Sequence, residues 1–212
     1  SLCITSLFSL QSECRALISH GTAMFKKTAL VIFLLLLTFP SGLHAADYAP
    51  FGLTWGATAK QITAAGIKLK PIEDDFYQTP NVPANADWAK TYVLYIDKKL
   101  GLVRVAAYTE DIANDPSGQT GKRTYYRLKA ELERTFVQVG NEEKDSATPG
   151  VVVPKGMSFY TCLESGGPCG PWFSTFVSGD INAQVVLDAL DKDAGYVSVI
   201  YENNALARKL GK

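Results

Sequence analysis

The stretch from Met24 to Ala46, MFKKTALVIFLLLLTFPSGLHAA, constrains this chain more than any other. Two lysines follow the methionine, an apolar run extends from Ala29 to Phe39, and a Pro-Ser-Gly turn precedes small residues. This order of a charged, an apolar and a cleavable part predicts a secretory signal peptide over residues 24–45. The run is shorter than the roughly 20 apolar residues that a spanning helix needs. We therefore expect cleavage near Ala45 or Ala46, and no membrane span in the mature protein.

The signal peptide also sets the expected domain organisation. Residues 1–23 lie upstream of a self-sufficient signal, and we interpret them as a non-native upstream extension. Residues 46–212 are long enough for one domain with a sizeable core. No cysteine follows the apolar run before Cys162, so the lipobox of a lipoprotein is absent. The predicted location is the periplasm.

Removal of the signal changes the chemistry that is available. Both histidines, His20 and His44, precede the mature domain. Catalytic triads, most zinc sites and most general bases at neutral pH depend on imidazole, so we predict no metal, no cofactor and no catalytic residues of these kinds. Basic and acidic residues balance at 21 each over the whole chain, which argues against nucleic acid as a partner.

Cys162 and Cys169 are the two cysteines of the mature domain. In an exported protein such a pair is expected to form a disulfide bond. Six intervening residues do not make a C-x-x-C redox motif, and two thiols without histidine make a poor zinc site. We predict a structural disulfide between them.

Two helices are predicted, a short one near the start of the mature domain and a longer one near its middle. Thr58 and Gln61 have the spacing of a capping box, which indicates a short helix that ends at Gly66. Apolar residues at helical spacing predict a longer helix from Tyr125 to Val139, ended by Gly140.

Strand patterns dominate the rest of the mature chain. Tyr92–Ile96 and Leu102–Tyr108 are predicted to form a hairpin. Three further strands, with turns between them, are predicted in the tail at 172–177, 183–190 and 196–201, followed by a short terminal helix. The predicted fold class is α+β, an antiparallel sheet of about five or six strands with one long and one or two short helices packed on it. Helix followed by strands occurs twice, which hints at a degenerate repeat.

Residues 71–89 are rich in Pro, Asn and Asp and are interpreted as a long surface loop. Its aromatic residues Phe76, Tyr77 and Trp88 are candidate partner contacts, since Tyr and Trp are favoured anchors at interfaces. The alternative is that these side chains pack under the loop, and that the loop is only a connector.

The segment FGLTWGAT near the mature start, YIDKKLGLVRV, and the tyrosine-rich helix resemble a family of small exported bacterial proteins of unknown function. Their mature chains begin with an FGL-x-WG-x-[ST] segment, and the resemblance extends loosely from Phe51 to Tyr201. A smaller likeness, in the capped helix start, is to outer-membrane assembly lipoproteins of the BamE type. That family needs a lipidated cysteine, which this chain lacks, so its function is not carried over.

These observations favour a non-catalytic periplasmic domain that binds an unknown protein or envelope component. A narrower form of this hypothesis is an inhibitor or immunity protein directed at a secreted enzyme. A carboxylate-based hydrolase is an alternative, and it would have to use Asp74-Asp75 or the cluster Asp188, Asp191 and Asp193. A lipid or small-ligand carrier is a further alternative, and it would need an apolar pocket beneath the long helix.

Overall fold

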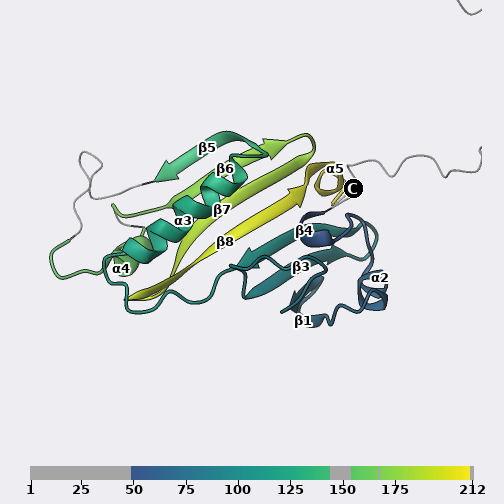
Figure 1. Cartoon of the computed structure of the whole chain (residues 1–212), viewed down its shortest axis with the longest axis horizontal. Coiled ribbons are helices and arrows are strands. Elements are labelled where there is room, and N and C mark those ends of the chain that lie inside the picture. Colours follow the sequence, from purple (N-terminus) through teal and green to yellow (C-terminus); the bar gives the residue numbers. More distant parts are fainter. Residues whose placement is uncertain (1–48, 144–153, 167, 211–212) are drawn as a thin grey trace, which may run out of the picture. The chain divides into compact units, whose positions relative to one another are not determined.

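The computed structural model describes residues 49–143, 154–166 and 168–210, so the signal-peptide prediction lies outside the described residues. The fold is organised around one antiparallel sheet in the order β1-β2-β3-β4-β8-β7-β6-β5 (Figure 1). Its strands are β1 (Lys70–Glu73), β2 (Phe76–Thr79), β3 (Thr91–Asp97), β4 (Gly101–Tyr108), β5 (Val137–Glu143), β6 (Trp172–Ser178), β7 (Ile181–Asp191) and β8 (Ala194–Asn203). The α+β class is confirmed, but the sheet has eight strands in the described part of the chain rather than five or six.

The sheet consists of two similar halves. In each half a helix precedes a meander of four antiparallel strands, with α2 (Ala59–Ala64) before β1–β4 and α3 (Gln119–Leu132) before β5–β8. The halves join through their last strands, because β4 pairs antiparallel with β8. The repeat that the order of elements suggested is therefore present in the topology.

The short helix α2 begins as its sequence predicts. The Gln61 backbone N–H donates to Thr58 Oγ1 at 3.3 Å, and the Thr58 N–H donates to Gln61 Oε1 at 2.8 Å. Both bonds satisfy groups that a helix start leaves without partners, which completes the capping box. Ile62 is the buried residue that docks this helix on the sheet.

The long helix is shorter than predicted. It ends at Leu132, and the prediction that it reaches Val139 is wrong. Val137 and Val139 instead belong to the edge strand β5 and are 69% and 60% exposed. Val139 extended the helical stripe by coincidence, and its spacing of two residues from Val137 is compatible with a strand.

The prediction of one long loop over residues 71–89 is also wrong in its first part. Strands β1 and β2 form a hairpin there, with Asp75 in the left-handed region at φ 62°. All four residues of β1 are exposed, so this edge strand lacks the apolar alternation that would have marked it. Residues 80–90 remain a connection between β2 and β3.

The predicted disulfide is present between Cys162 and Cys169. Cys162 lies on α4 (Phe159–Glu164), a helix that the sequence patterns did not predict. Ser158 caps this helix by accepting from the Thr161 N–H. Beyond the second cysteine, the Trp172 indole N–H donates to the Cys169 carbonyl oxygen at 2.8 Å, which connects the disulfide loop to β6.

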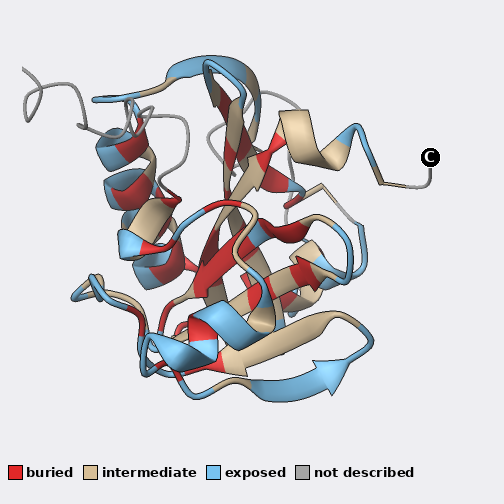
Figure 2. Cartoon of the chain, turned by 90° about the vertical axis from the view of Figure 1, so that its right-hand side faces the viewer, coloured by how far each residue is buried: buried red, intermediate tan, exposed pale blue. Residues whose placement is uncertain are grey.

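Two apolar clusters cover one face of the sheet. The first cluster includes Trp55 and Ile62 from the N-terminal segment, and the second includes residues of α3 and α4. Figure 2 shows α3 on one side of the strands, with its buried residues turned toward them. Trp88 and Tyr201 pack against both clusters and so connect them. Among the described residues, no helix is long and apolar enough to cross a membrane.

Candidate functional site

The second face of the sheet is the broadest candidate surface. In the described ranges, the buried residues of both clusters and of the helices lie on the opposite face. Alternation along each strand places every second side chain on this side. We call it the open face, made by Phe76, Gln78, Thr91, Val93, Tyr95, Arg104, Ala106, Tyr108, Phe173, Thr175, Val177, Asn182, Gln184, Val186, Asp188, Tyr196, Ser198, Ile200 and Glu202.

An aromatic and charged row crosses the open face from β2 to β8. The Phe76 and Tyr95 rings lie 4.9 Å apart, and Tyr95 is opposite Arg104 on β4. Arg104 Nε donates to Glu202 Oε2 at 2.8 Å, and its guanidinium makes an ion pair with the same carboxylate. This row presents large side chains whose positions are fixed by their neighbours.

A second aromatic group lies near the other end of the strands. The Tyr108 and Tyr196 rings are 5.8 Å apart, and Asp188 stands directly opposite Tyr196 on β7. Burial raises the pKa of the Asp188 carboxyl. Burial, followed by the charge of Asp188, raises the pKa of both tyrosines.

Between these groups the open face is shallow. Ala106 and Ser198 are small and buried, and Ile200 lies opposite Ala106. A depression of about 250 Å³ lies beside them, with Arg104 and Glu202 on its wall. Ligand pockets for small molecules usually measure about 300–1,000 Å³. The open face is therefore a broad surface with a small central hollow rather than a pocket.

The three predicted contact residues do not form one site. Phe76 lies on the open face, whereas Tyr77 points to the opposite face and packs against the first cluster. Trp88 packs against both clusters and lies 6.4 Å from the Phe51 ring. The expected patch of exposed loop aromatics is thus replaced by a patch on strands, to which Tyr95 contributes.

The carboxylate groups proposed for catalysis are far apart. Asp74 and Asp75 lie at the β1–β2 turn, and Asp188 to Asp193 lie on β7 and its hairpin. Five strand spacings separate β1 from β7, which is about 24 Å. Asp188 is the acid with a raised pKa, but its neighbour across the strands is Tyr196 and not a second carboxylate. The two groups cannot share one site.

A polar cluster around Glu143 connects the helix layer to the sheet. Its carboxylate accepts from Lys129 Nζ at 2.6 Å, and from the hydroxyls of Tyr125 at 3.0 Å and Tyr126 at 3.2 Å. Burial by itself would raise the pKa of the Glu143 carboxyl, but these donors outweigh burial and lower it. Ser174, which donates to Glu143 and contacts Tyr125, is fully buried. The contacts are internal and hold β5 against α3.

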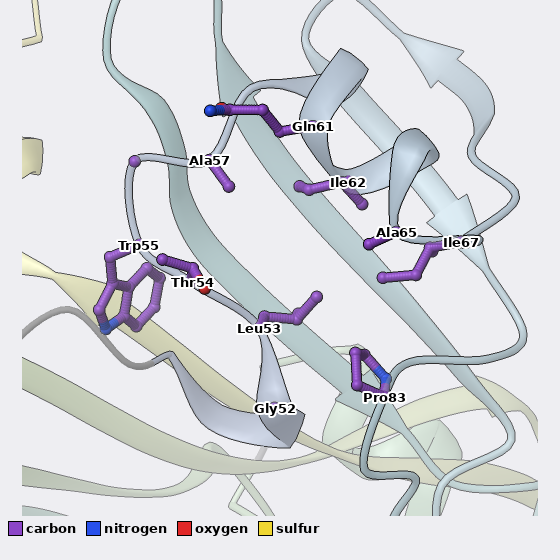
Figure 3. Close-up of a pocket in the computed structure, with 11 residues that line it drawn as sticks. Gly52, Leu53, Thr54, Trp55, Ala57, Gln61, Ile62, Ala65, Ile67 and Pro83 are labelled. Carbon is purple, nitrogen blue, oxygen red and sulfur yellow. The ribbon is translucent and has the colours of Figure 1, made fainter. Parts of the chain in front are cut away.

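An apolar groove of about 330 Å³ lies beside the N-terminal motif (Figure 3). Leu53, Ile62, Ile67 and Pro83 line it, together with Gln61, whose side chain is engaged in the capping box. The FGLTWG residues thus form a wall of the groove and a part of the first core. The described residues hold no group of three or more His, Cys, Asp or Glu side chains that could bind a metal ion.

No family model, curated protein or solved structure matches this chain. The described residues form a two-layer α+β domain with an eight-stranded antiparallel sheet. Within that class, the described part of this chain has its helices on one face of the sheet and an aromatic, mixed-charge surface on the other.

Proposed function

We propose that this protein is a non-catalytic binding domain of the periplasm, and that its open face binds a protein partner. The observation that carries the proposal is the open face with its two aromatic groups, which no helix of the described residues covers. Phe, Tyr and Arg are enriched in the cores of protein interfaces, whereas lysine is depleted. The open face has five Phe or Tyr residues and one arginine, and it includes no lysine.

The size of the open face also favours a protein over a small molecule. Six strands of about eight residues give an outline of roughly 29 by 26 Å, or about 750 Å². A stable protein interface buries about 800 Å² on each partner. The outline of the open face is therefore close to the size of a stable protein interface.

Export is the second part of the proposal. The disulfide between Cys162 and Cys169 fits an oxidising compartment, and it agrees with the signal sequence predicted before Ala46. A partner would therefore be another exported protein or a protein of the envelope. Inhibition of a secreted enzyme would be one way in which such binding acts.

The test compares substitutions on the two sides of the sheet. Tyr108→Ser alters the open face, and Tyr126→Ser changes the same residue type on the helix side, where Tyr126 is 44% exposed. Chemical cross-linking in periplasmic extract, with the wild-type protein as bait, should give one stoichiometric partner. We expect the partner to be lost with Tyr108→Ser and retained with Tyr126→Ser, both proteins being folded by circular dichroism. Retention by the open-face variant would reject this surface.

A further inference from the structure

A separate cavity of about 640 Å³ lies past the C-terminal end of α3. Four segments that are distant in the sequence surround it. They are the N-terminal motif at Trp55, the residue Phe136 between α3 and β5, the β6–β7 turn, and the start of α5 (Asn204–Ala207). The volume lies within the range of about 300–1,000 Å³ that is typical of ligand pockets.

The cavity walls are mainly apolar. Trp55, Phe136, Ile181 and Leu206 contribute rings and branched aliphatic groups. Of the polar side chains in the lining, Asn203 accepts from the Leu206 N–H at 3.1 Å. The Asp180 carboxylate is neutralised by an ion pair with Arg208 at 3.1 Å. These walls favour an apolar guest over a sugar or an amino acid, because such polar ligands need several hydrogen-bonding groups that converge on them.

One buried donor at the cavity lacks a partner among the described residues. Trp55 is only 7% exposed, and its buried indole nitrogen makes no hydrogen bond to the described residues. Figure 3 shows this nitrogen turned away from Gln61 and Ile62, the side of the N-terminal groove. Trp55 lines both this cavity and the N-terminal groove. An unpaired buried donor is destabilising, and a ligand with a hydrogen-bond acceptor would satisfy it.

We infer that this cavity binds a single aliphatic chain that carries one carbonyl or carboxylate group, the chemistry of a fatty acyl ligand. The chain occupies the space between Phe136, Ile181 and Leu206, and its oxygen accepts a hydrogen bond from the Trp55 indole after a small adjustment of the ring. This site is independent of the open face, so either proposal can fail without the other.

The test uses a matched pair of alanine-to-tryptophan substitutions. Ala205 lies on α5 at the cavity, and Ala65 lines the N-terminal groove on the other side of Trp55. Palmitate is titrated into the wild-type protein and both variants by isothermal calorimetry. We expect one site in the wild type, binding at least about tenfold weaker in Ala205→Trp, and little change in Ala65→Trp, since only the first substitution fills the cavity.

A further variant tests the hydrogen bond. Trp55→Phe keeps an aromatic wall and removes the donor, so it should weaken palmitate more than it weakens hexadecane, which has no acceptor. Absence of palmitate binding to the wild-type protein would overturn the inference. Equal palmitate binding by the wild type and Ala205→Trp would also overturn it. So would equal weakening of palmitate binding by Ala205→Trp and Ala65→Trp, provided that both variants have wild-type melting temperatures.

Discussion

Reduction of the Cys162–Cys169 disulfide is expected to lower the stability of the domain without unfolding it. The two cysteines are seven positions apart, so the bond closes a short loop. The chain-entropy model gives about 2.5 kcal/mol for a loop of this length. Both sulfur-bearing side chains are buried in the second cluster, and reduction leaves that packing largely in place.

The expected change is large enough to measure by thermal or urea denaturation. For a domain of this size, 1 kcal/mol shifts the melting temperature by about 2–4 °C, so reduction should lower it by about 5–10 °C. The measurement is circular dichroism at 222 nm, with and without dithiothreitol. The double variant Cys162→Ala, Cys169→Ala is the control, because its melting temperature should not respond to the reductant.

Two results would contradict this reasoning. If the reduced and oxidised proteins had the same unfolding midpoint, the loop constraint would contribute nothing to stability. If reduction abolished the folded state altogether, the disulfide would hold far more of the structure than one short loop. In the second case α4 and the start of β6 would depend on the bond for their placement.

Three further substitutions test individual features of the fold. Gly101→Ala should lower the free energy of unfolding, measured by urea denaturation, by at least about 2 kcal/mol. Gly101 has φ +73°, and an added Cβ would lie 2.0 Å from the Gly56 carbonyl oxygen. An unchanged unfolding midpoint would refute this clash. Glu143→Gln should make the free energy of unfolding less dependent on pH below about pH 4.5. The Glu143 carboxyl has a lower pKa in the folded protein than in the unfolded chain, so it stabilises the fold above its unfolded-state pKa. This stabilisation is lost as the pH falls through its folded-state pKa. Asp188→Asn should raise the melting temperature at pH 7 and lose this advantage in acid, since a carboxyl with a raised pKa destabilises when ionised; a lower melting temperature at pH 7 would contradict it.

The parts of the fold that the sequence predicted well are those with one buried face. Tyr92–Ile96 and Leu102–Tyr108 both lie in strands, and the three predicted tail strands are parts of β6, β7 and β8. Their apolar residues alternate because one side of each strand faces a core. The capping box at Thr58 was equally readable, since it depends on local backbone chemistry.

The errors fall on the edge strands β1 and β5, on β2 beside β1, and on a short helix. Strand β1 is wholly exposed and β5 is mostly so, and an exposed strand carries no alternation to detect. Helix α4 has six residues, too few for a periodic stripe, although Ser158 before it was a usable capping signal. Two missed edge strands account for most of the difference between the predicted and observed sheet.

The candidate site was predictable in residue type but not in position. Phe76 was selected as a loop aromatic, but it lies in strand β2, on the open face that we propose as a binding surface. Tyr95 and Tyr108 were assigned to strands. The sequence alone did not show whether their side chains lie on the face that the helices cover or on the open face. That information comes from contacts such as β4 with β8, which join residues about 100 positions apart.

Trp88 allows the two interpretations of the 80–90 connection to be separated. As a partner contact, Trp88 could be replaced with little effect on stability. As a residue that packs against both clusters, Trp88 should help to couple the two halves of the sheet. Trp88→Ala should then lower the free energy of unfolding by about 2–3 kcal/mol. This loss is smaller than for a fully buried tryptophan because Trp88 is half-buried. Differential scanning calorimetry measures both the loss and the breadth of the transition. A lower and broader transition, with partner binding intact at low temperature, supports the packing role, whereas unchanged melting with lost binding would return Trp88 to the binding site.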